Sequence, residues 1–425
     1  MYRSLLGFAV LVAACATEPQ FAQEADVATT AQALGVTSVT REHVAGDVYH
    51  YGFVLRVGDG PNAQLHVHRV VRERAPWVPR HTTGAVMMMH GDFATFSTNF
   101  VPGPSGIAPW LAERSIDVWG VDRRWTQATA TAPDVSDFDA MGITQELDDI
   151  AAVLTFARGV RVVTDASADR LTLVGFSRGG ELAYFYASRE ATLPAAQRHV
   201  KAIVPLDVYV SLAPADEDLR QFFCTSAEFE YEALAAGFVD SPNDLQITVG
   251  RLALTAPGDQ TPFQRSFPGR TNRDVMLAFV GQTYRLFPAS PLYHLIAPVL
   301  DSGVPIGLRT SPERVVETWL ANAPPTQSMR ESADTDALTC GDAPPIDVPL
   351  SRIRVPLLLI AAAGGYGEHA LYSTTQVGST DVTTLVIRQL PVDREAEDFG
   401  HADLLFSPDA PALAWQPLLS WLRAH

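Results

Sequence analysis

The chain has 425 residues, with 31 Lys and Arg against 48 Asp and Glu, and a formal net charge of −17 at pH 7. This charge argues against nucleic acid and anionic membrane surfaces as partners, because both would repel an acidic protein. Hydrophobic residues make up 47% of the chain, which is enough to bury a large core. The length allows two or three domains, or one large body that carries an insertion.

The N-terminus has the pattern of an export signal. Residues 1–14 carry one Arg and a run of about 8 to 10 apolar residues, which is too short to span a bilayer. The Leu-Val-Ala-Ala that precedes Cys15 resembles the lipobox of bacterial lipoproteins, whose cysteine becomes the lipidated end of the mature chain. The alternative is a secretory leader cut near Ala16. We expect an exported protein at the periplasm or cell surface that contacts membrane only through lipid at Cys15.

The segment after this cysteine predicts a tether, and the two remaining cysteines predict a disulfide. Residues 15–46 are polar and rich in Ala and Thr without a sustained period, which predicts a tether. Cys224 and Cys340 form an even pair in an oxidising setting, which predicts a disulfide; two buried thiols are the alternative.

Predicted strands and helices alternate over residues 47–208 and 349–425. Two runs at 48–57 and 64–71, separated by a turn, predict a hairpin. Continuous apolar runs, which are typical of strands covered on both faces, follow at 84–90, 116–122, 171–176, 200–207, 355–363 and 383–388. The alternation predicts an α/β fold with a doubly wound, mostly parallel sheet.

Residues 209–348 interrupt this alternation. They contain helical patterns rich in Phe, Leu and Pro, such as residues 273–284 and 311–320. We interpret this segment as a helical cap inserted over the sheet, and Cys224 and Cys340 lie near its two ends, where a bridge would pin its base.

The most informative motif is Gly175-Phe-Ser-Arg-Gly179. A Ser hydroxyl attacks acyl groups only if it stands clear of the sheet, next to a base and beside free backbone N–H groups. Two glycines permit the sharp strand-to-helix turn that places it there. A Gly- and Ser-rich loop would give the same letters by chance, but here an apolar strand precedes the motif and a helical pattern follows it. The context therefore predicts that Ser177 is a nucleophile.

A base follows the last predicted strand, in Asp398-Phe-Gly-His401-Ala-Asp403. With this residue, the order of elements resembles the α/β-hydrolase superfamily over residues 47–208 and 350–425. The motifs that carry the resemblance are His90-Gly-Asp-Phe, the motif around Ser177, and the Gly-His-x-Asp that contains His401. The resemblance implies that Ser177 is the nucleophile and His401 the general base. It also implies that the backbone N–H groups of Asp92 and Arg178 stabilise the oxyanion.

The resemblance leaves the acid of the triad open. Most of the superfamily has an Asp shortly after the strand that matches residues 356–363, where this chain reads Gly364-Gly-Tyr-Gly-Glu368. Asp207 ends the strand that follows the nucleophile strand, which places it at the carboxyl edge of the sheet, and some lipases take their acid from that strand. We predict Asp207 as the acid, with Glu368 as the alternative and Asp398 as a third candidate.

The activity that the resemblance implies is a serine hydrolase that cleaves small-molecule carboxylic esters through an acyl-enzyme. Two alternatives stay open: a peptide or amide hydrolase with the same triad, and a non-catalytic, lipid-anchored binding protein on the same fold. Dehalogenase and epoxide hydrolase activity are disfavoured, because those members have Asp at the position of Ser177. No cofactor and no metal are expected; His66 and His68 share one strand face, but no third ligand is apparent.

Overall fold

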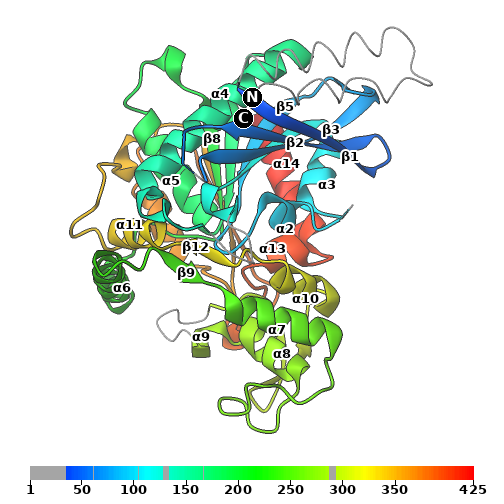
Figure 1. Cartoon of the computed structure of the whole chain (residues 1–425), viewed down its shortest axis with the longest axis vertical. Helices are drawn as coiled ribbons and strands as arrows, with labels where there is room; N and C mark the ends of the chain where they lie inside the picture. Colours follow the sequence, from blue (N-terminus) through cyan, green and yellow to red (C-terminus); the bar gives the residue numbers. More distant parts are fainter. Residues whose placement is uncertain (1–34, 61, 104, 128–133, 166, 287–292) are drawn as a thin grey trace, which may run out of the picture.

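The computed structural model describes residues 35–425, except residues 61, 104, 128–133, 166 and 287–292 (Figure 1). The predicted signal at residues 1–14, the lipidation site Cys15 and most of the predicted tether lie outside the described residues.

Ten strands form one sheet through the centre of the molecule (Figure 1). The strand order is β1-β2-β3-β6-β5-β7-β8-β13-β14, and β4 pairs with β3. The strands from β1 to β6 in this order are antiparallel to their neighbours, and those from β6 to β14 are parallel. The predicted doubly wound, mostly parallel sheet is therefore confirmed. The bounds are β1 (Val36–Ala45), β2 (Val48–Arg56), β3 (Gln64–Ala75), β4 (Val78–Pro79), β5 (Gly84–Met89), β6 (Ile116–Asp122), β7 (Leu171–Phe176), β8 (Val200–Leu206), β13 (Leu357–Ala362) and β14 (Val382–Ile387).

Helices cover both faces of this sheet. In β13, Leu358 and Ile360 pack into the core that includes α3 and α14, whereas Leu357 and Leu359 pack into the core that includes α4 and α5. Because successive side chains of a strand point to opposite faces, a strand buried on both sides is apolar at every position. The helices of this body are α2 (Phe96–Phe100), α3 (Ile107–Glu113), α4 (Ile143–Asp165), α5 (Arg178–Glu190), α12 (His369–Thr375), α13 (Asp403–Phe406) and α14 (Gln416–Ala424).

The predicted tether is wrong for residues 36–45, which form the edge strand β1, antiparallel to β2. Five of its ten residues are exposed and four are half-buried, so its polar side chains gave no apolar period. Val36 is buried, and the guanidinium of Arg41 bonds to Glu73 and lies 3.9 Å from the ring centre of Tyr49. These contacts fix the strand to the body.

Residues 209–348, called the insertion below, lie outside the central sheet (Figure 1). Within the described residues, its short strands pair only with each other, β9 with β12 and β10 with β11. None of the described helices is both long enough and apolar enough to cross a bilayer. The elements of the insertion are α6 (Glu217–Ala235), β9 (Asp240–Pro242), α7 (Asp244–Thr255), α8 (Asn272–Gly281), α9 (Thr283–Leu286), β10 (Pro298–Asp301), β11 (Val304–Leu308), α10 (Glu313–Ala321), β12 (Thr326–Ser328) and α11 (Met329–Cys340).

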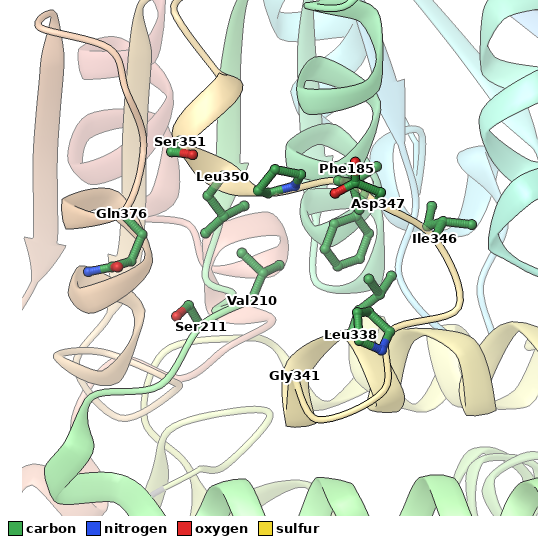
Figure 2. A pocket seen from close by; sticks show the side chains of 13 residues that line it. Phe185, Val210, Ser211, Leu338, Gly341, Ile346, Asp347, Leu350, Ser351 and Gln376 are labelled. Atoms are coloured by element: carbon green, nitrogen blue, oxygen red, sulfur yellow. The ribbon is translucent and has the colours of Figure 1, made fainter.

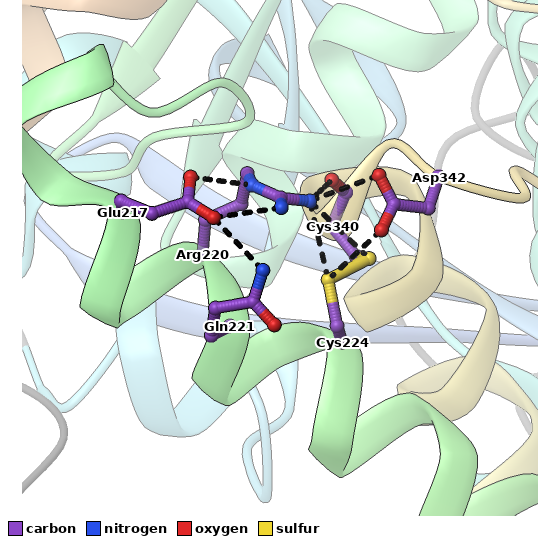
Figure 3. Close-up of a disulfide and its surroundings, with 6 residues drawn as sticks. All are labelled: Glu217, Arg220, Gln221, Cys224, Cys340 and Asp342. Atoms are coloured by element: carbon purple, nitrogen blue, oxygen red, sulfur yellow. Dashed lines mark hydrogen bonds and ion pairs between the residues drawn. A yellow bond between two sulfur atoms is a disulfide. The ribbon is translucent and has the colours of Figure 1, made fainter.

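A disulfide joins the first and last helices of the insertion (Figure 3). Cys224 of α6 and Cys340 at the end of α11 are 116 residues apart in sequence, and their Cα atoms are 4.9 Å apart. Arg220 donates hydrogen bonds to the carbonyl oxygen of Cys340 and to Asp342, both at 3.0 Å. The predicted pairing is therefore present, and it links two helices that pack side by side.

Removing this bridge should lower the stability of the protein. On the chain-entropy model, opening a loop of this length costs up to about 5 kcal/mol, and less if the native bond is strained. We expect the Cys224→Ser/Cys340→Ser variant to unfold at a lower denaturant concentration than the oxidised wild type. A reductant should lower the wild-type midpoint toward that of the variant and leave the variant unchanged; equal midpoints for both oxidised proteins would contradict the prediction.

Candidate active site

Ser177 stands at a sharp turn between β7 and α5. Its backbone has φ +56° and ψ −127°, a combination that L residues rarely adopt and that persists only when the surroundings enforce it. A Cβ at Gly175 would overlap the backbone of Gly179, and a Cβ at Gly179 would overlap the carbonyl oxygen of Met89 in β5. The two glycines of the motif are therefore required by close backbone packing on both sides of Ser177.

His401 and Asp207, which are far apart in sequence, meet at the same edge of the sheet. The Nδ1 atom of His401 lies 2.7 Å from Oδ2 of Asp207, and both side chains are almost fully buried. Asp207 follows the last residue of β8, and His401 lies in the loop before α13. The carboxylate thus accepts the Nδ1–H of the imidazole and fixes the orientation of its ring.

The loop at residues 362–367 supplies the remaining partners of this carboxylate. The backbone N–H groups of Ala362 and Gly367 donate to Oδ1 at 2.9 and 3.3 Å, and the N–H of Tyr366 approaches both oxygens. A Cβ at Gly365 would overlap Oδ2 of Asp207. The glycine-rich stretch after β13 was a candidate source of the acid. It instead supplies backbone N–H donors to the carboxylate of Asp207, which follows the neighbouring strand β8.

The other two candidate acids lie elsewhere. The side chain of Glu368 is 61% exposed, and its ion-pair partner is Arg388 at 3.8 Å. The carboxylate of Asp398 is buried and accepts hydrogen bonds from backbone N–H groups, including that of Phe399 at 2.7 Å. Neither carboxylate has a contact with His401, so the structure brings only Asp207 to the imidazole among the three candidates.

The ring of His401 lies beside the turn that carries Ser177. Its centre is 4.4 Å from that of Phe176, the residue before the serine, and 5.3 Å from the ring centres of both Tyr293 and Tyr366. Within the described part of the chain, neither the Ser177 hydroxyl nor Nε2 of His401 has a hydrogen-bond partner. Since Asp207 occupies Nδ1, Nε2 is the nitrogen that remains available for proton transfer.

The loop of residues 90–93, called the 90–93 loop below, packs directly against Ser177. A Cβ at Gly91 would lie 3.0 Å from the Cβ of Ser177. The N–H of Gly91 donates to Asn99, but the N–H groups of Asp92 and of Arg178 have no acceptor among the described residues. Arg178 is the first residue of α5, where N–H groups are free and the helix dipole favours negative charge.

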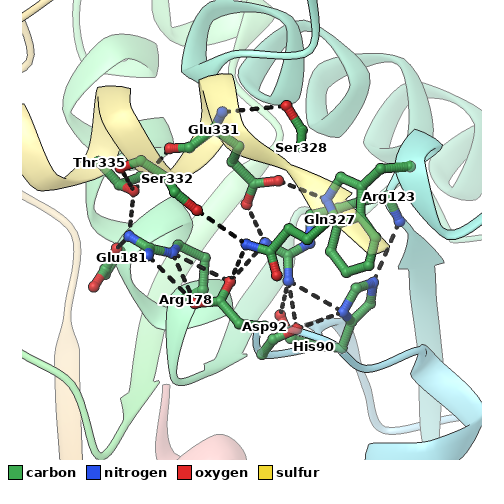
Figure 4. A network of polar contacts seen from close by, with 12 residues as sticks. His90, Asp92, Arg123, Arg178, Glu181, Gln327, Ser328, Glu331, Ser332 and Thr335 are labelled. Atoms are coloured by element: carbon green, nitrogen blue, oxygen red, sulfur yellow. Dashed lines mark hydrogen bonds and ion pairs between the residues drawn. The ribbon is translucent and has the colours of Figure 1, made fainter. Parts of the chain in front are cut away.

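The side chains of these two residues belong to a network of polar contacts (Figure 4). Arg178 approaches the carboxylate of Asp92 at 3.3 Å and also bonds to Thr335 of α11. Gln327 of β12 donates to Asp92 at 2.7 Å, and Glu331 of α11 bonds to Arg123. No sequence signal marked Gln327, Glu331 and Thr335, because they are isolated polar residues in a segment without a motif.

Burial changes the protonation of several groups in and around this network. Burial, and then the charge of Arg123, lower the pKa of His90 to about 3, so this histidine stays neutral. Its Nε2 accepts the backbone N–H of Arg123, and its Nδ1 bonds to the Gly91 carbonyl. Burial raises the pKa of Glu181 to about 7 and that of Glu230 to about 8. These two acids are partly protonated near neutral pH, which limits the negative charge around Arg178.

The histidines of β3 make protein contacts. His68 lies between His50 at 2.9 Å and Asp122 at 3.1 Å, and its ring stacks on Phe96. Burial lowers the pKa of His66.

The cluster of potential metal ligands found in the described residues contains the two disulfide sulfurs and Asp342. Sulfurs that are bonded to each other are not thiolate ligands.

A cavity of about 360 Å³ lies between α5 and the segment that follows α11 (Figure 2). Phe185, Val210, Leu338 and Ile346 are among the residues that line it. Ser177, Asp207 and His401 are not, so this cavity is separate from the candidate active site.

The close packing at the Ser177 turn predicts how Gly179→Ala changes the free energy of unfolding. The sign of this change distinguishes packing from helix propensity. Alanine favours a helix over glycine by about 1 kcal/mol, so propensity alone predicts that Gly179→Ala stabilises α5. The overlap with Met89 predicts the opposite, and we expect a loss of about 1–3 kcal/mol in the free energy of unfolding. Gly84→Ala is the control, because its Cβ would meet Ile116 at 3.8 Å, an ordinary contact. Denaturant unfolding measures both; a stabilised Gly179→Ala variant would contradict the close packing.

Comparisons with known proteins agree with this architecture. No protein-family profile matches the chain, and no curated protein sequence matches it. Among solved structures, a candidate lipase from Sulfolobus solfataricus is 14% identical; the match covers 91% of this chain and 99% of that one, with a TM-score of 0.62.

Two further structures match less well. A soluble variant of monoglyceride lipase from Saccharomyces cerevisiae is 12% identical, with coverage of 91% and 95% and a TM-score of 0.46. A mutant epoxide hydrolase from Solanum tuberosum is 12% identical, with coverage of 91% and 100% and a TM-score of 0.40. The first match, together with the strand order and the helices on both faces, shows that the chain has the α/β-hydrolase fold.

Proposed function

We propose that this protein is a serine hydrolase that cleaves carboxylic esters through an acyl-enzyme intermediate. The observation that carries the proposal is the buried hydrogen bond of 2.7 Å between Asp207 and His401, next to a serine in a strained backbone conformation. The backbone N–H groups of Asp92 and Arg178 lie beside that serine and have no acceptor among the described residues, which supports the same proposal.

Each group has a role that follows from its position. The hydroxyl of Ser177 attacks the carbonyl carbon of the substrate, and Nε2 of His401 takes the hydroxyl proton and passes it to the leaving alcohol. The N–H groups of Asp92 and Arg178 donate to the oxyanion that forms. A water molecule, activated by the same imidazole, then hydrolyses the acyl-enzyme.

Asp207 keeps the imidazole in the tautomer that this cycle requires. Its contact with Nδ1 leaves Nε2 without a proton in the resting state, so Nε2 can act as a base. The backbone N–H groups of the 362–367 loop compensate the buried negative charge, which would otherwise be costly to hold away from water.

Esters are proposed ahead of amides because the neighbour with the highest fold similarity reported above is described as a candidate lipase. A fold alone does not fix substrate choice. We propose that the insertion acts as a cap that selects the substrate, since its residues Gln327, Glu331 and Thr335 already contact the groups around Ser177.

We also propose that the protein works outside the cytoplasm, anchored by lipid at Cys15. The bridge between Cys224 and Cys340 supports export, because structural disulfides persist mainly in oxidising compartments.

A fluorophosphonate probe should test the nucleophile. We expect the probe to label the wild type at Ser177 and to leave Ser177→Ala unlabelled, since the probe needs an activated hydroxyl. Mass spectrometry locates the label, and matched esters and amides of one acyl group measure the bond preference. A folded wild type without label, or a Ser177→Ala variant that keeps full ester hydrolysis, would contradict the proposed function.

Two carboxylate variants should identify the acid. In Asp207→Asn the amide N–H₂ faces Nδ1 of His401, which moves the imidazole proton to Nε2 and removes the base; we expect kcat to fall about 10⁴-fold. Glu368→Gln is the matched control, and its kcat should stay within about twofold because its side chain is exposed and pairs with Arg388. A large loss in Glu368→Gln with an active Asp207→Asn would reverse the assignment.

A further inference from the structure

The insertion makes a specific pair of hydrogen bonds with the 90–93 loop (Figure 4). Gln327, which is 1% exposed, lies in β12, more than two hundred residues after this loop. Its Oε1 accepts the N–H of Phe93 at 3.1 Å, and its Nε2 donates to Oδ1 of Asp92 at 2.7 Å. One amide side chain therefore fixes two consecutive residues of the loop that borders Ser177.

The loop needs such support because its backbone is strained. Phe93 has φ +48°, in the left-handed region that residues with a bulky side chain rarely occupy, and such conformations persist when surrounding contacts enforce them. Arg123 donates to the carbonyl oxygens of His90 and Gly91 and thereby fixes the first half of the loop. The second half, Asp92 and Phe93, is held by Gln327.

We propose that Gln327 is a positioning residue for the oxyanion site of the proposed hydrolase. By holding Asp92 on one side and Phe93 on the other, its amide orients the peptide N–H of Asp92 beside that of Arg178. This inference rests on the proposed function, because the N–H of Asp92 has a catalytic role only if the protein is a serine hydrolase. It also assigns the insertion a role in the chemistry, in addition to substrate choice.

The polarity of the amide is essential to the proposal. Gln327 accepts through Oε1 and donates through Nε2, which faces the carboxylate of Asp92 and, at 3.5 Å, the hydroxyl of Ser332. A glutamate at this position could still accept the N–H of Phe93, but its second oxygen would face Asp92 and repel it. The other charged groups close to this contact are Arg178, which pairs with Asp92 at 3.3 Å, and Arg123, which lies 3.8 Å from Asp92 and is bonded to Glu331.

A swap of this polarity tests the proposal. We expect Gln327→Glu to lower kcat about tenfold to a hundredfold, with KM within about twofold, because a small displacement of a catalytic donor is costly in the transition state alone. In the double variant Asp92→Asn/Gln327→Glu, the side-chain amide at position 92 can donate to the carboxylate at position 327. The total charge is unchanged, and kcat should rise at least about tenfold above that of the single variant.

Two controls separate positioning from general stability. Gln327→Met keeps the volume and removes all the side-chain hydrogen bonds of Gln327. It should lose kcat like Gln327→Glu but show no rescue by Asp92→Asn. Arg330, in the helix α11 that follows β12, forms an exposed ion pair with Asp139, and Arg330→Gln should keep wild-type kinetics. Thermal unfolding of each variant is measured beside its ester hydrolysis and its rate of fluorophosphonate labelling.

The outcomes distinguish the two proposals. A wild type that labels and hydrolyses, with Gln327→Glu and Gln327→Met equally active, would overturn the positioning role and leave the proposed function intact. A loss in Gln327→Glu without rescue in the double variant would also overturn it, because the hydrogen-bond polarity would then be irrelevant. A wild type that neither labels nor hydrolyses esters would remove the proposed function and this inference with it.

Discussion

Three backbone N–H groups and one imidazole converge on the buried carboxylate of Asp207. This carboxylate links the end of β8, the loop after β13 and the loop before α13, three segments that the chain reaches at widely separated positions. Since a buried charge is stable only when it is fully hydrogen-bonded, the three segments must keep their positions for the carboxylate to remain there. The orientation of His401, and with it every role proposed for Ser177, depends on this set of contacts.

A second constraint comes from the insertion. Strand β12 and helix α11 contact the groups on both sides of Ser177, through Gln327 to Asp92 and through Thr335 to Arg178. The disulfide at the end of α11 connects this helix to α6, so Thr335 of the polar network and Cys340 of the bridge lie on the same helix. The insertion therefore contributes to the framework of the candidate site.

Much of this arrangement could be predicted from the sequence, for identifiable physical reasons. Strands β5, β6, β7, β8 and β13 are buried on both faces, so their continuous apolar runs identified them, and the motif at Ser177 and the late loop at His401 identified the candidate site. The acid was ambiguous because Asp207 and Glu368 both follow apolar strands, and only the folded backbone shows which one meets the imidazole. Strand β1 was missed because an exposed edge strand has no apolar period.

The exclusion of any side chain at Gly365 limits where an acid can stand beside His401. A Cβ there would overlap the oxygen of Asp207 that bonds to His401, so the position after β13 and the position after β8 compete for the same small volume. An acid can reach the imidazole from one strand or from its neighbour, but not from both at once.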